Sequence, residues 1–337
     1  MSNRIFIIGG GGQIGRAVAL KFLTLGWNVI SSGRKVPNEP INNDRIKYVT
    51  VDRHDTQRMR EAISPGVDLL LDCLSFDESD SNQLVELQDL VGRICVISSA
   101  SVYMDDQGRT LDEASDFGFP DFGGPLNIDH RIVEPGPATY STRKVAMELR
   151  LLSSAAEKST ILRPCAIYGP HSKHAREWFF VKRLLDGRKQ IPLAYEGKTR
   201  FHTTSVKHIA QAVAAAIESA TPSTMNVVDP QAPTTREIGE AIMSAAGIYA
   251  EIIGLPVVDE YPPSVGANPW GLKRDMICVV SNAYSPIGEY GDLIKPTIDW
   301  LMSDLDLVDW KSELPVLAAY PFSLFDYEKE DELLRGL

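Results

Sequence analysis

The sequence predicts an α/β fold, in which a parallel, doubly wound sheet is followed by a smaller C-terminal lobe. Short apolar runs alternate with segments of helical spacing along residues 1–170. A glycine-rich turn directly follows the first apolar run. Residues 171–205 and 230–320 are less regular and are rich in proline and aromatic side chains. Strands that alternate with helices favour a parallel sheet with right-handed crossovers and helices on both faces.

Each element is expected from its own run of residues. Apolar runs predict strands at Arg4–Ile8, Asn28–Ser32, Tyr48–Val51, Val67–Leu74, Arg93–Ser98, Thr160–Arg163 and Met225–Val228. Residues 14–25 carry apolar side chains at helical spacing, and Gly26 is expected to end that helix. A second helix begins near Thr139, and the charged tail, residues 325–337, is also expected to be helical.

The composition excludes several classes of function. Of the 337 residues, 44% are hydrophobic and 23% are charged, as in ordinary globular proteins. A net charge of −11 without a basic cluster argues against nucleic-acid binding. The apolar stretches are too short to cross a bilayer and no signal-peptide pattern is present, so we expect a cytoplasmic protein without a membrane partner. Four scattered cysteines predict free thiols, and no spacing of histidines supports a metal site.

The glycine-rich turn predicts a dinucleotide site. Gly9, Gly12 and Gly15 satisfy one spacing of the dinucleotide fingerprint, and Gly10 in place of Gly9 satisfies another. Glycines there permit a tight turn, the approach of a pyrophosphate to the backbone, and close packing of helix on strand. The helix N-terminus then faces the phosphates with N–H groups and a favourable dipole. A strand before the turn and an amphipathic helix after it indicate a Rossmann-type sheet rather than a flexible loop.

The end of the second strand suggests which dinucleotide binds. Sites for NAD usually place an acid there, where it accepts hydrogen bonds from the ribose hydroxyls. This strand instead continues into Gly33, Arg34 and Lys35, whose cations suit a 2′-phosphate. The sequence therefore favours NADP over NAD, with a solvated basic loop as the alternative interpretation. Asp52, at the end of the third strand, is expected either to contact the adenine or to cap a turn.

Three side chains form a set suited to proton transfer. Tyr140 and Lys144 are four residues apart, so they lie on one helix face, and Ser99 follows the fifth strand. A lysine near the phenol, beside a positively charged nicotinamide, stabilises the phenolate and can also bind the ribose. Ser99 would polarise the substrate oxygen, and Tyr140 would exchange a proton with it while the nicotinamide carries a hydride.

These residues resemble the extended short-chain dehydrogenase/reductase family, also called the NAD-dependent epimerase/dehydratase family. The resemblance covers about residues 4–305 and is strongest in the first 210. It rests on the glycine turn, on the runs Ser98–Tyr103 and Tyr140–Lys144, and on Leu162–Pro170. The resemblance implies a dinucleotide-dependent enzyme, contact between the last run and the nicotinamide amide, and a homodimer built on a two-helix face.

The motif and the resemblance together give the expected site. The catalytic residues are Ser99, Tyr140 and Lys144. The expected cofactor-binding residues are Gly9, Gly12, Gln13, Ile14, Gly15, Gly33, Arg34, Lys35, Asp52, Arg53, Leu74, Tyr140, Lys144, Pro164 and Ile167. The expected dinucleotide-binding domain comprises residues 1–170, completed by about 203–230. Residues 171–202 and 231–337 form the expected substrate-binding lobe and tail.

Departures from the family pattern bear on the reaction. Sugar dehydratases carry an Asp-Glu pair where this chain has Ala100 and Ser101, which disfavours sugar 4,6-dehydration. Ala166 replaces an asparagine that contacts the diphosphate in many epimerases. We therefore expect an oxidoreductase that favours NADP(H), acting on a carbonyl or secondary alcohol of a small polar substrate. One alternative is a nucleotide-sugar epimerase that retains its cofactor, and another is a non-enzymatic relative. In the epimerase, His171 or His174 would be a second acid/base, although each could instead be an ordinary histidine of a surface loop.

Overall fold

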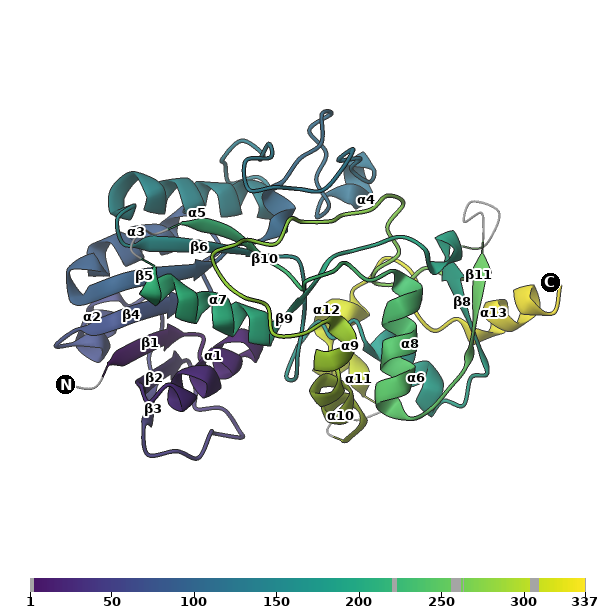
Figure 1. Cartoon of the computed structure of the whole chain (residues 1–337), viewed down its shortest axis with the longest axis horizontal. Helices are drawn as coiled ribbons and strands as arrows, with labels where there is room; N and C mark the ends of the chain where they lie inside the picture. The colour runs from purple at the N-terminus through teal and green to yellow at the C-terminus, as the bar shows by residue number, and fades with distance from the viewer. Residues whose placement is uncertain (1–2, 220–222, 256–261, 263, 304–308, 337) are drawn as a thin grey trace. The chain divides into compact units, whose positions relative to one another are not determined.

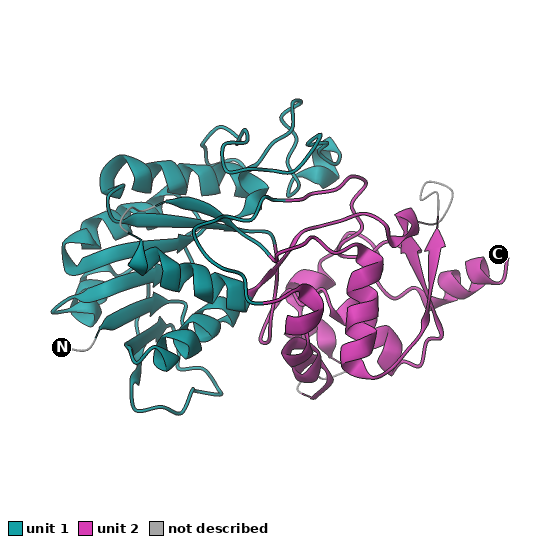
Figure 2. Ribbon diagram, viewed as in Figure 1, with its two compact units in different colours: residues 1–165, 206–228, 278–287 teal, residues 166–205, 229–277, 288–337 magenta. Residues whose placement is uncertain are grey.

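The computed structural model describes residues 3–219, 223–255, 262, 264–303 and 309–336, which divide into two compact units (Figure 2). Unit 1 comprises Met1–Cys165, Val206–Val228 and Cys278–Ile287. Unit 2 comprises Ala166–Ser205, Asp229–Ile277 and Gly288–Leu337. The return of residues 278–287 to unit 1 has no counterpart in the sequence expectation. Residues 256–261 and 304–308 of the expected lobe lie outside the described residues.

Unit 1 is built on a seven-stranded sheet whose order is β10-β6-β5-β4-β1-β2-β3. Every neighbouring pair is parallel, so the predicted doubly wound sheet is confirmed. The strands are β1 (Arg4–Ile8), β2 (Asn28–Gly33), β3 (Ile46–Thr50), β4 (Val67–Asp72), β5 (Val91–Ile97), β6 (Ser159–Pro164) and β10 (Thr224–Val227). Strand order reverses between β1 and β4, and ligands of such sheets bind at the carboxyl ends of the strands beside that point.

One strand is shorter than the sequence predicts. The apolar run at 67–74 suggested a strand through Leu74, but β4 ends at Asp72. The Asp72 carboxylate accepts a hydrogen bond from the Leu74 N–H at 2.7 Å, and this contact turns the chain out of the sheet. Residues 73 and 74 therefore belong to a loop at the carboxyl edge of the sheet, where side chains are available to a ligand.

Helices cover both faces of the sheet. Helices α3 (Glu78–Leu87) and α5 (Tyr140–Ala155) run side by side along one face, and α1 (Gln13–Thr24) packs beside α7 (Val206–Glu218) along the other (Figure 1). Alternate strand residues, such as Phe6 and Ile8, join side chains of α2 (Thr56–Ile63), α3 and α5 in one buried apolar cluster. This rigid core fixes the loops that leave the sheet.

Unit 2 contains two short parallel strand pairs and a group of helices. The strand β7 (Ala166–Tyr168) pairs with β9 (Thr203–Ser205), and β8 (Gln190–Ala194) pairs with β11 (Glu251–Leu255). The helices are α6 (Trp178–Leu185), α8 (Thr235–Ala246), α9 (Tyr290–Leu293), α10 (Lys295–Ser303), α11 (Trp310–Glu313), α12 (Pro315–Ala318) and α13 (Tyr327–Leu334). Trp178, Phe179 and Phe180 are fully buried, so this aromatic run of α6 is core.

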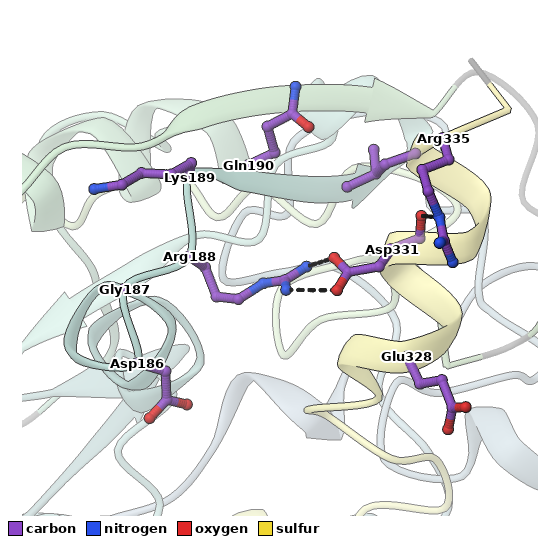
Figure 3. Close-up of a pocket in the computed structure, with 9 residues that line it drawn as sticks. Asp186, Gly187, Arg188, Lys189, Gln190, Glu328, Asp331 and Arg335 are labelled. Atoms are coloured by element: carbon purple, nitrogen blue, oxygen red, sulfur yellow. Dashed lines mark hydrogen bonds and ion pairs between the residues drawn. The ribbon is translucent and has the colours of Figure 1, made fainter.

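The C-terminal helix α13 is tied to the rest of unit 2 by ion pairs. Its buried Glu330 pairs with Arg183, whose guanidinium lies 3.8 Å from the centroid of the Phe179 ring. Figure 3 shows a second tie, in which Arg188 reaches both carboxylate oxygens of Asp331. A polar cavity of about 640 Å³ lies beside this pair, with both acidic and basic side chains around it.

Candidate active site

The glycine turn brings the backbone of β1 close to that of α1. Gly9 has a φ of 78°, a left-handed conformation that glycine adopts without steric cost. The N–H groups of Gly9 and Gly10 donate to the Ser32 carbonyl at 3.1 Å. A Cβ added to Gly15 would stand 2.5 Å from the Gly9 oxygen and 2.6 Å from the Gly10 Cα. Only glycine at position 15 therefore allows the helix to pack this closely against the turn.

The N-terminus of α1 has the features of a phosphate site. Gly12 is the N-cap, no side chain caps the helix, and its first turn holds no acid. A Cβ on Gly12 would have one protein atom within 4 Å, the Gly9 oxygen at 3.4 Å. Packing within the protein therefore does not explain a glycine at this position, and its missing side chain leaves space in front of the helix end. N–H groups and the positive end of the helix dipole face this space, and they fit a pyrophosphate.

A cavity of about 350 Å³ lies at the carboxyl ends of β1 to β4, entirely within unit 1. It adjoins the glycine turn, as the adenosine end of a dinucleotide requires. Six residues expected to bind the cofactor line it together: Gly9, Gly33, Arg34, Asp52, Arg53 and Leu74. Six further lining residues, which the sequence reasoning missed, are Ile8, Ser32, Val51, His54, Phe76 and Asp80.

The polar rim of this cavity contains both signs of charge. Gly33 is the last residue of β2, and the exposed Arg34 follows it. Lys35 is exposed but is not among the lining residues of the cavity. Asp52 accepts a hydrogen bond from the His54 N–H at 3.0 Å, so it stabilises a turn and also faces the cavity. A dinucleotide in the cavity would meet Arg34, directly after β2, and Asp52, two residues after the end of β3.

Ser99 and Tyr140 come together at the same edge of the sheet. Ser99 follows β5 and accepts a hydrogen bond from the Ser101 N–H at 3.1 Å, which caps a short 3₁₀ helix. Tyr140 is the first residue of α5, whose start is fixed by a capping box between Thr139 and Thr142. The Ser99 side chain lies close enough to the Tyr140 hydroxyl to lower the pKa of the phenol. Two hydroxyls therefore converge on one point.

Lys144 lies one helical turn after Tyr140 and is only 3% exposed. Its ammonium donates to the carbonyl oxygens of Ser75, at 2.5 Å, and Ile97, at 2.9 Å. The same nitrogen lies 5.6 Å from the centroid of the Tyr140 ring and 4.7 Å from that of Phe76. Lys144 thus places a positive charge near the phenol ring while its hydrogen bonds go to the backbone.

Burial shifts the acidity of both groups. It lowers the pKa of Lys144 to about 8, against the opposing effect of Asp72, Glu148 and Asp80. It raises the pKa of Tyr140 to about 12; Asp112 adds to this effect and Ser99 opposes it. Protein groups alone therefore keep Tyr140 protonated, as a proton donor, and leave Lys144 mostly charged at pH 7 but able to lose its proton just above that pH.

Buried ion pairs that the sequence did not predict support this set. Glu148 of α5 forms two hydrogen bonds with Arg163 of β6, at 3.0 and 2.6 Å, and anchors the helix to the sheet. Arg53 pairs with Asp72 at 2.9 Å and with Asp80 at 3.1 Å. Aspartates at a strand end and at a helix start are common capping residues, so their pairing with a distant arginine gave no local signal.

The remaining candidates lie elsewhere. Pro164 is buried at the end of β6, and Gln13 and Ile14 are half-buried in the first turn of α1. Ile167 belongs to β7 of unit 2. His174 lies in a turn and is half-buried, with its Nε2 2.8 Å from the Tyr320 hydroxyl. Burial, assisted by Arg176, lowers the pKa of His174 to about 2, which makes it a poor acid at neutral pH.

Within the described ranges, no group of three or more histidine, cysteine or acidic side chains is arranged to hold a metal ion. Among those same residues, no helix has the length and apolar character that crossing a membrane requires.

Three solved structures share the fold of this chain. A dTDP-glucose 4,6-dehydratase of Bacillus anthracis, in complex with NAD, is 15% identical with a TM-score of 0.66, covering 93% of this chain and 100% of that one. A UDP-glucose 4-epimerase of Thermotoga maritima, with UDP-glucose, is 15% identical with a TM-score of 0.66, covering 90% and 100%. A UDP-glucuronic acid 4-epimerase of Bacillus cereus, with UDP-glucuronic acid and NAD, is 15% identical with a TM-score of 0.63, covering 89% and 99%.

Sequence comparison gives the family. No curated protein sequence matches the chain. The model of the NAD dependent epimerase/dehydratase family matches residues 5–227, which contain the glycine turn, Ser99, Tyr140 and Lys144. This match confirms the resemblance inferred from the motifs and the prediction of an enzyme that depends on a nicotinamide dinucleotide. Because the match spans well over half of its length, the chain belongs to the NAD dependent epimerase/dehydratase family.

Proposed function

We propose that this protein is an oxidoreductase of the extended short-chain type that favours NADP(H). It reduces a carbonyl group, or oxidises a secondary alcohol, on a small polar substrate. The observation that carries the proposal is the approach of Ser99 to the Tyr140 hydroxyl, with the Lys144 ammonium 5.6 Å from the centroid of the phenol ring. These groups follow β5 and begin α5, at the sheet edge where the glycine turn and the cavity also lie.

The residues of the chain would divide the chemistry as follows. A bound nicotinamide supplies the hydride to the carbonyl carbon, or accepts it from the alcohol carbon. Ser99 donates a hydrogen bond to the substrate oxygen. In reduction, Tyr140 gives that oxygen its hydroxyl proton, and in oxidation it takes the proton back. Lys144, held by Ser75 and Ile97, stabilises the phenolate and binds the ribose next to the nicotinamide.

The preference for NADP(H) is proposed from the end of β2. Arg34 lines the cavity, and β2 ends without an acid that would repel a 2′-phosphate. Lys35 adds positive charge beside it. The pyrophosphate is assigned to the first turn of α1, with Gly12, Gln13, Ile14 and Gly15, and the nicotinamide to Pro164 and Ile167. Binding of the substrate is assigned to unit 2, in a cytosolic protein that forms a homodimer.

A second candidate function is epimerisation of a nucleotide sugar. It is supported by the similar structures that were solved with UDP-glucose or with UDP-glucuronic acid and NAD. An epimerase returns the hydride to the same substrate, so the dinucleotide stays bound through the cycle and none is consumed.

Mass spectrometry of the purified protein, followed by an NADPH-consumption assay, separates the two functions. The oxidoreductase releases its dinucleotide and consumes NADPH when an aldehyde or ketone is added. An epimerase retains the dinucleotide and interconverts UDP-glucose and UDP-galactose without net loss of NADPH. Absence of dinucleotide binding would contradict both.

A further inference from the structure

The loop between β4 and α3, residues 73–77, is held by a hydrogen bond at every residue. The Cys73 N–H donates to the Ile8 carbonyl at 3.1 Å, and the Leu74 N–H donates to Asp72 at 2.7 Å. The Asp80 carboxylate accepts from the N–H groups of residues 76 and 77, at 2.6 and 3.4 Å. The carbonyl of Ser75 is the one that receives the Lys144 ammonium. Leu74 and Phe76 of this loop line the cavity.

Arg53 ties the two ends of this loop together. Its Nη1 donates to both oxygens of Asp72, at 3.2 and 2.9 Å, and to the Leu74 carbonyl at 2.7 Å. Its Nη2 lies 3.1 Å from a carboxylate oxygen of Asp80. The three side chains are 11%, 0% and 7% exposed, so water screens these pairs weakly. Asp72 ends β4 and Asp80 lies in the first turn of α3, and one guanidinium spans both.

The charges of this group also act on Lys144. Asp72 and Asp80, from β4 and α3, and Glu148, from α5 itself, favour its protonated form, whereas Arg53 disfavours it. The Cys73 thiol is a further titratable neighbour, and burial keeps its pKa well above the ordinary value, so it stays neutral. Asp72 contributes the largest opposition to the effect of burial on Lys144.

We propose that Arg53, Asp72 and Asp80 form a clamp that positions the cofactor-facing loop and the Lys144 ammonium, and that Arg53 is not a ligand of a cofactor phosphate. The inference rests on the proposed function, since it assigns residues that support the dinucleotide and Lys144. Nη1 of Arg53 donates to Asp72 and to the Leu74 carbonyl, and Nη2 forms an ion pair with Asp80. Nε and Nη2 make no hydrogen bond, and both atoms are buried. A phosphate placed against this guanidinium would also meet those two carboxylates, which would repel it. Discrimination between NADP(H) and NAD(H) is therefore left to Arg34 and Lys35.

The test of the clamp is the affinity of the full chain for NADPH and for NADH, measured by tryptophan fluorescence titration at pH values from 6 to 10. Asp72→Asn keeps the shape of the side chain and an acceptor for the Leu74 N–H, but removes the charge. Arg53→Lys keeps the charge but cannot reach all of the same acceptors. It replaces Asp72→Asn in the test if circular dichroism shows that Asp72→Asn is unfolded. Arg58→Gln, at an arginine whose side chain is 72% exposed, is the control for loss of a surface charge.

The clamp predicts that Asp72→Asn and Arg53→Lys weaken binding of both dinucleotides by a similar factor of about ten, because charged hydrogen bonds that order the site are lost. In Asp72→Asn, affinity also falls at a lower pH than in the wild type, because Lys144 loses its proton more readily. Arg58→Gln behaves like the wild type. Affinities within twofold of the wild type and an unshifted pH dependence would overturn the clamp. A loss confined to NADPH would instead make Arg53 a phosphate ligand, and a wild type that binds neither dinucleotide would overturn the proposed function as well.

Discussion

The side chain of Ser99, which follows β5, lies close enough to the hydroxyl of Tyr140, at the start of α5, to lower the pKa of that phenol. The two residues are 41 positions apart, and the fold brings them together because β5 ends and α5 begins at the carboxyl edge of the sheet. A substrate oxygen that accepts from one of these hydroxyls can also accept from the other. This pairing is the feature from which the catalytic predictions derive.

Tyr140→Phe removes the proposed proton donor and keeps the ring. We expect turnover to fall roughly 10²–10⁴-fold, the usual contribution of general acid–base catalysis, with NADPH affinity nearly unchanged. Steady-state kinetics and a fluorescence titration measure the two effects. Tyr249→Phe, at an exposed tyrosine of unit 2, is the matched control and should leave both unchanged. Turnover of Tyr140→Phe at the wild-type rate would refute the catalytic assignment.

Arg34→Gln tests the preference for the phosphorylated dinucleotide. Loss of a charged hydrogen bond to the 2′-phosphate is expected to weaken NADPH binding about ten- to a hundredfold and to leave NADH binding unchanged. Isothermal titration with each dinucleotide gives the ratio. Lys47→Gln removes an exposed charge from β3 and should change neither affinity. Equal losses for NADPH and NADH would show that Arg34 does not discriminate between them.

Gly15→Ala tests the packing of the dinucleotide turn. The added methyl group would stand 2.5 Å from the Gly9 oxygen, so the turn must shift. We expect a loss of about 1–3 kcal/mol in the free energy of unfolding, together with loss of dinucleotide binding. Gly124→Ala is the control, since no atom lies within 4 Å of its added Cβ. Chemical denaturation and dinucleotide titration of both variants would reveal any such difference, and equal behaviour would contradict the packing argument.

Glu177 makes the stability of the protein depend on pH. Burial raises the pKa of Glu177 from 4.5 to about 7, against weaker effects of its own backbone N–H, Arg176 and Tyr290. The folded state therefore holds this proton to a higher pH than the unfolded chain does. The stabilisation is fully present below pH 4.5 and is lost as pH rises through 7.

Glu177→Gln should remove that dependence. Between pH 4 and pH 8, the free energy of unfolding of the variant should rise by at most about 3 kcal/mol relative to that of the wild type, as measured by urea unfolding. Glu240→Gln, at an exposed position of α8, controls for loss of an acidic charge. The same difference between Glu177→Gln and wild type at both pH values would exclude Glu177 as the group responsible.

The parts of the fold that depend on local signals were predictable from the sequence. Gly9 to Gly15 is a contiguous motif, and Tyr140 and Lys144 are related by one helical turn. Strand positions followed from apolar runs, with errors of a few residues where a polar contact decides the end. At β4 the deciding contact is the hydrogen bond from the Leu74 N–H to Asp72, which composition alone does not reveal.

The clamp could not be predicted in the same way. Arg53, Asp72 and Asp80 come from three separate segments, and each looks like an ordinary residue of a turn or a helix start. Their relation arises only when the sheet order places the end of β3, the end of β4 and the start of α3 around one cavity. Similarly, the position of His174 against Tyr320 joins residues 146 apart, which no local pattern encodes.

A crystal structure of the protein with NADPH would test the central claim most directly. The account predicts the pyrophosphate at the first turn of α1, the 2′-phosphate at Arg34, and the nicotinamide ring beside the hydroxyl of Tyr140, with the ribose bound by Lys144. A nicotinamide bound away from Tyr140, or a dinucleotide bound outside the cavity at the ends of β1 to β4, would contradict it.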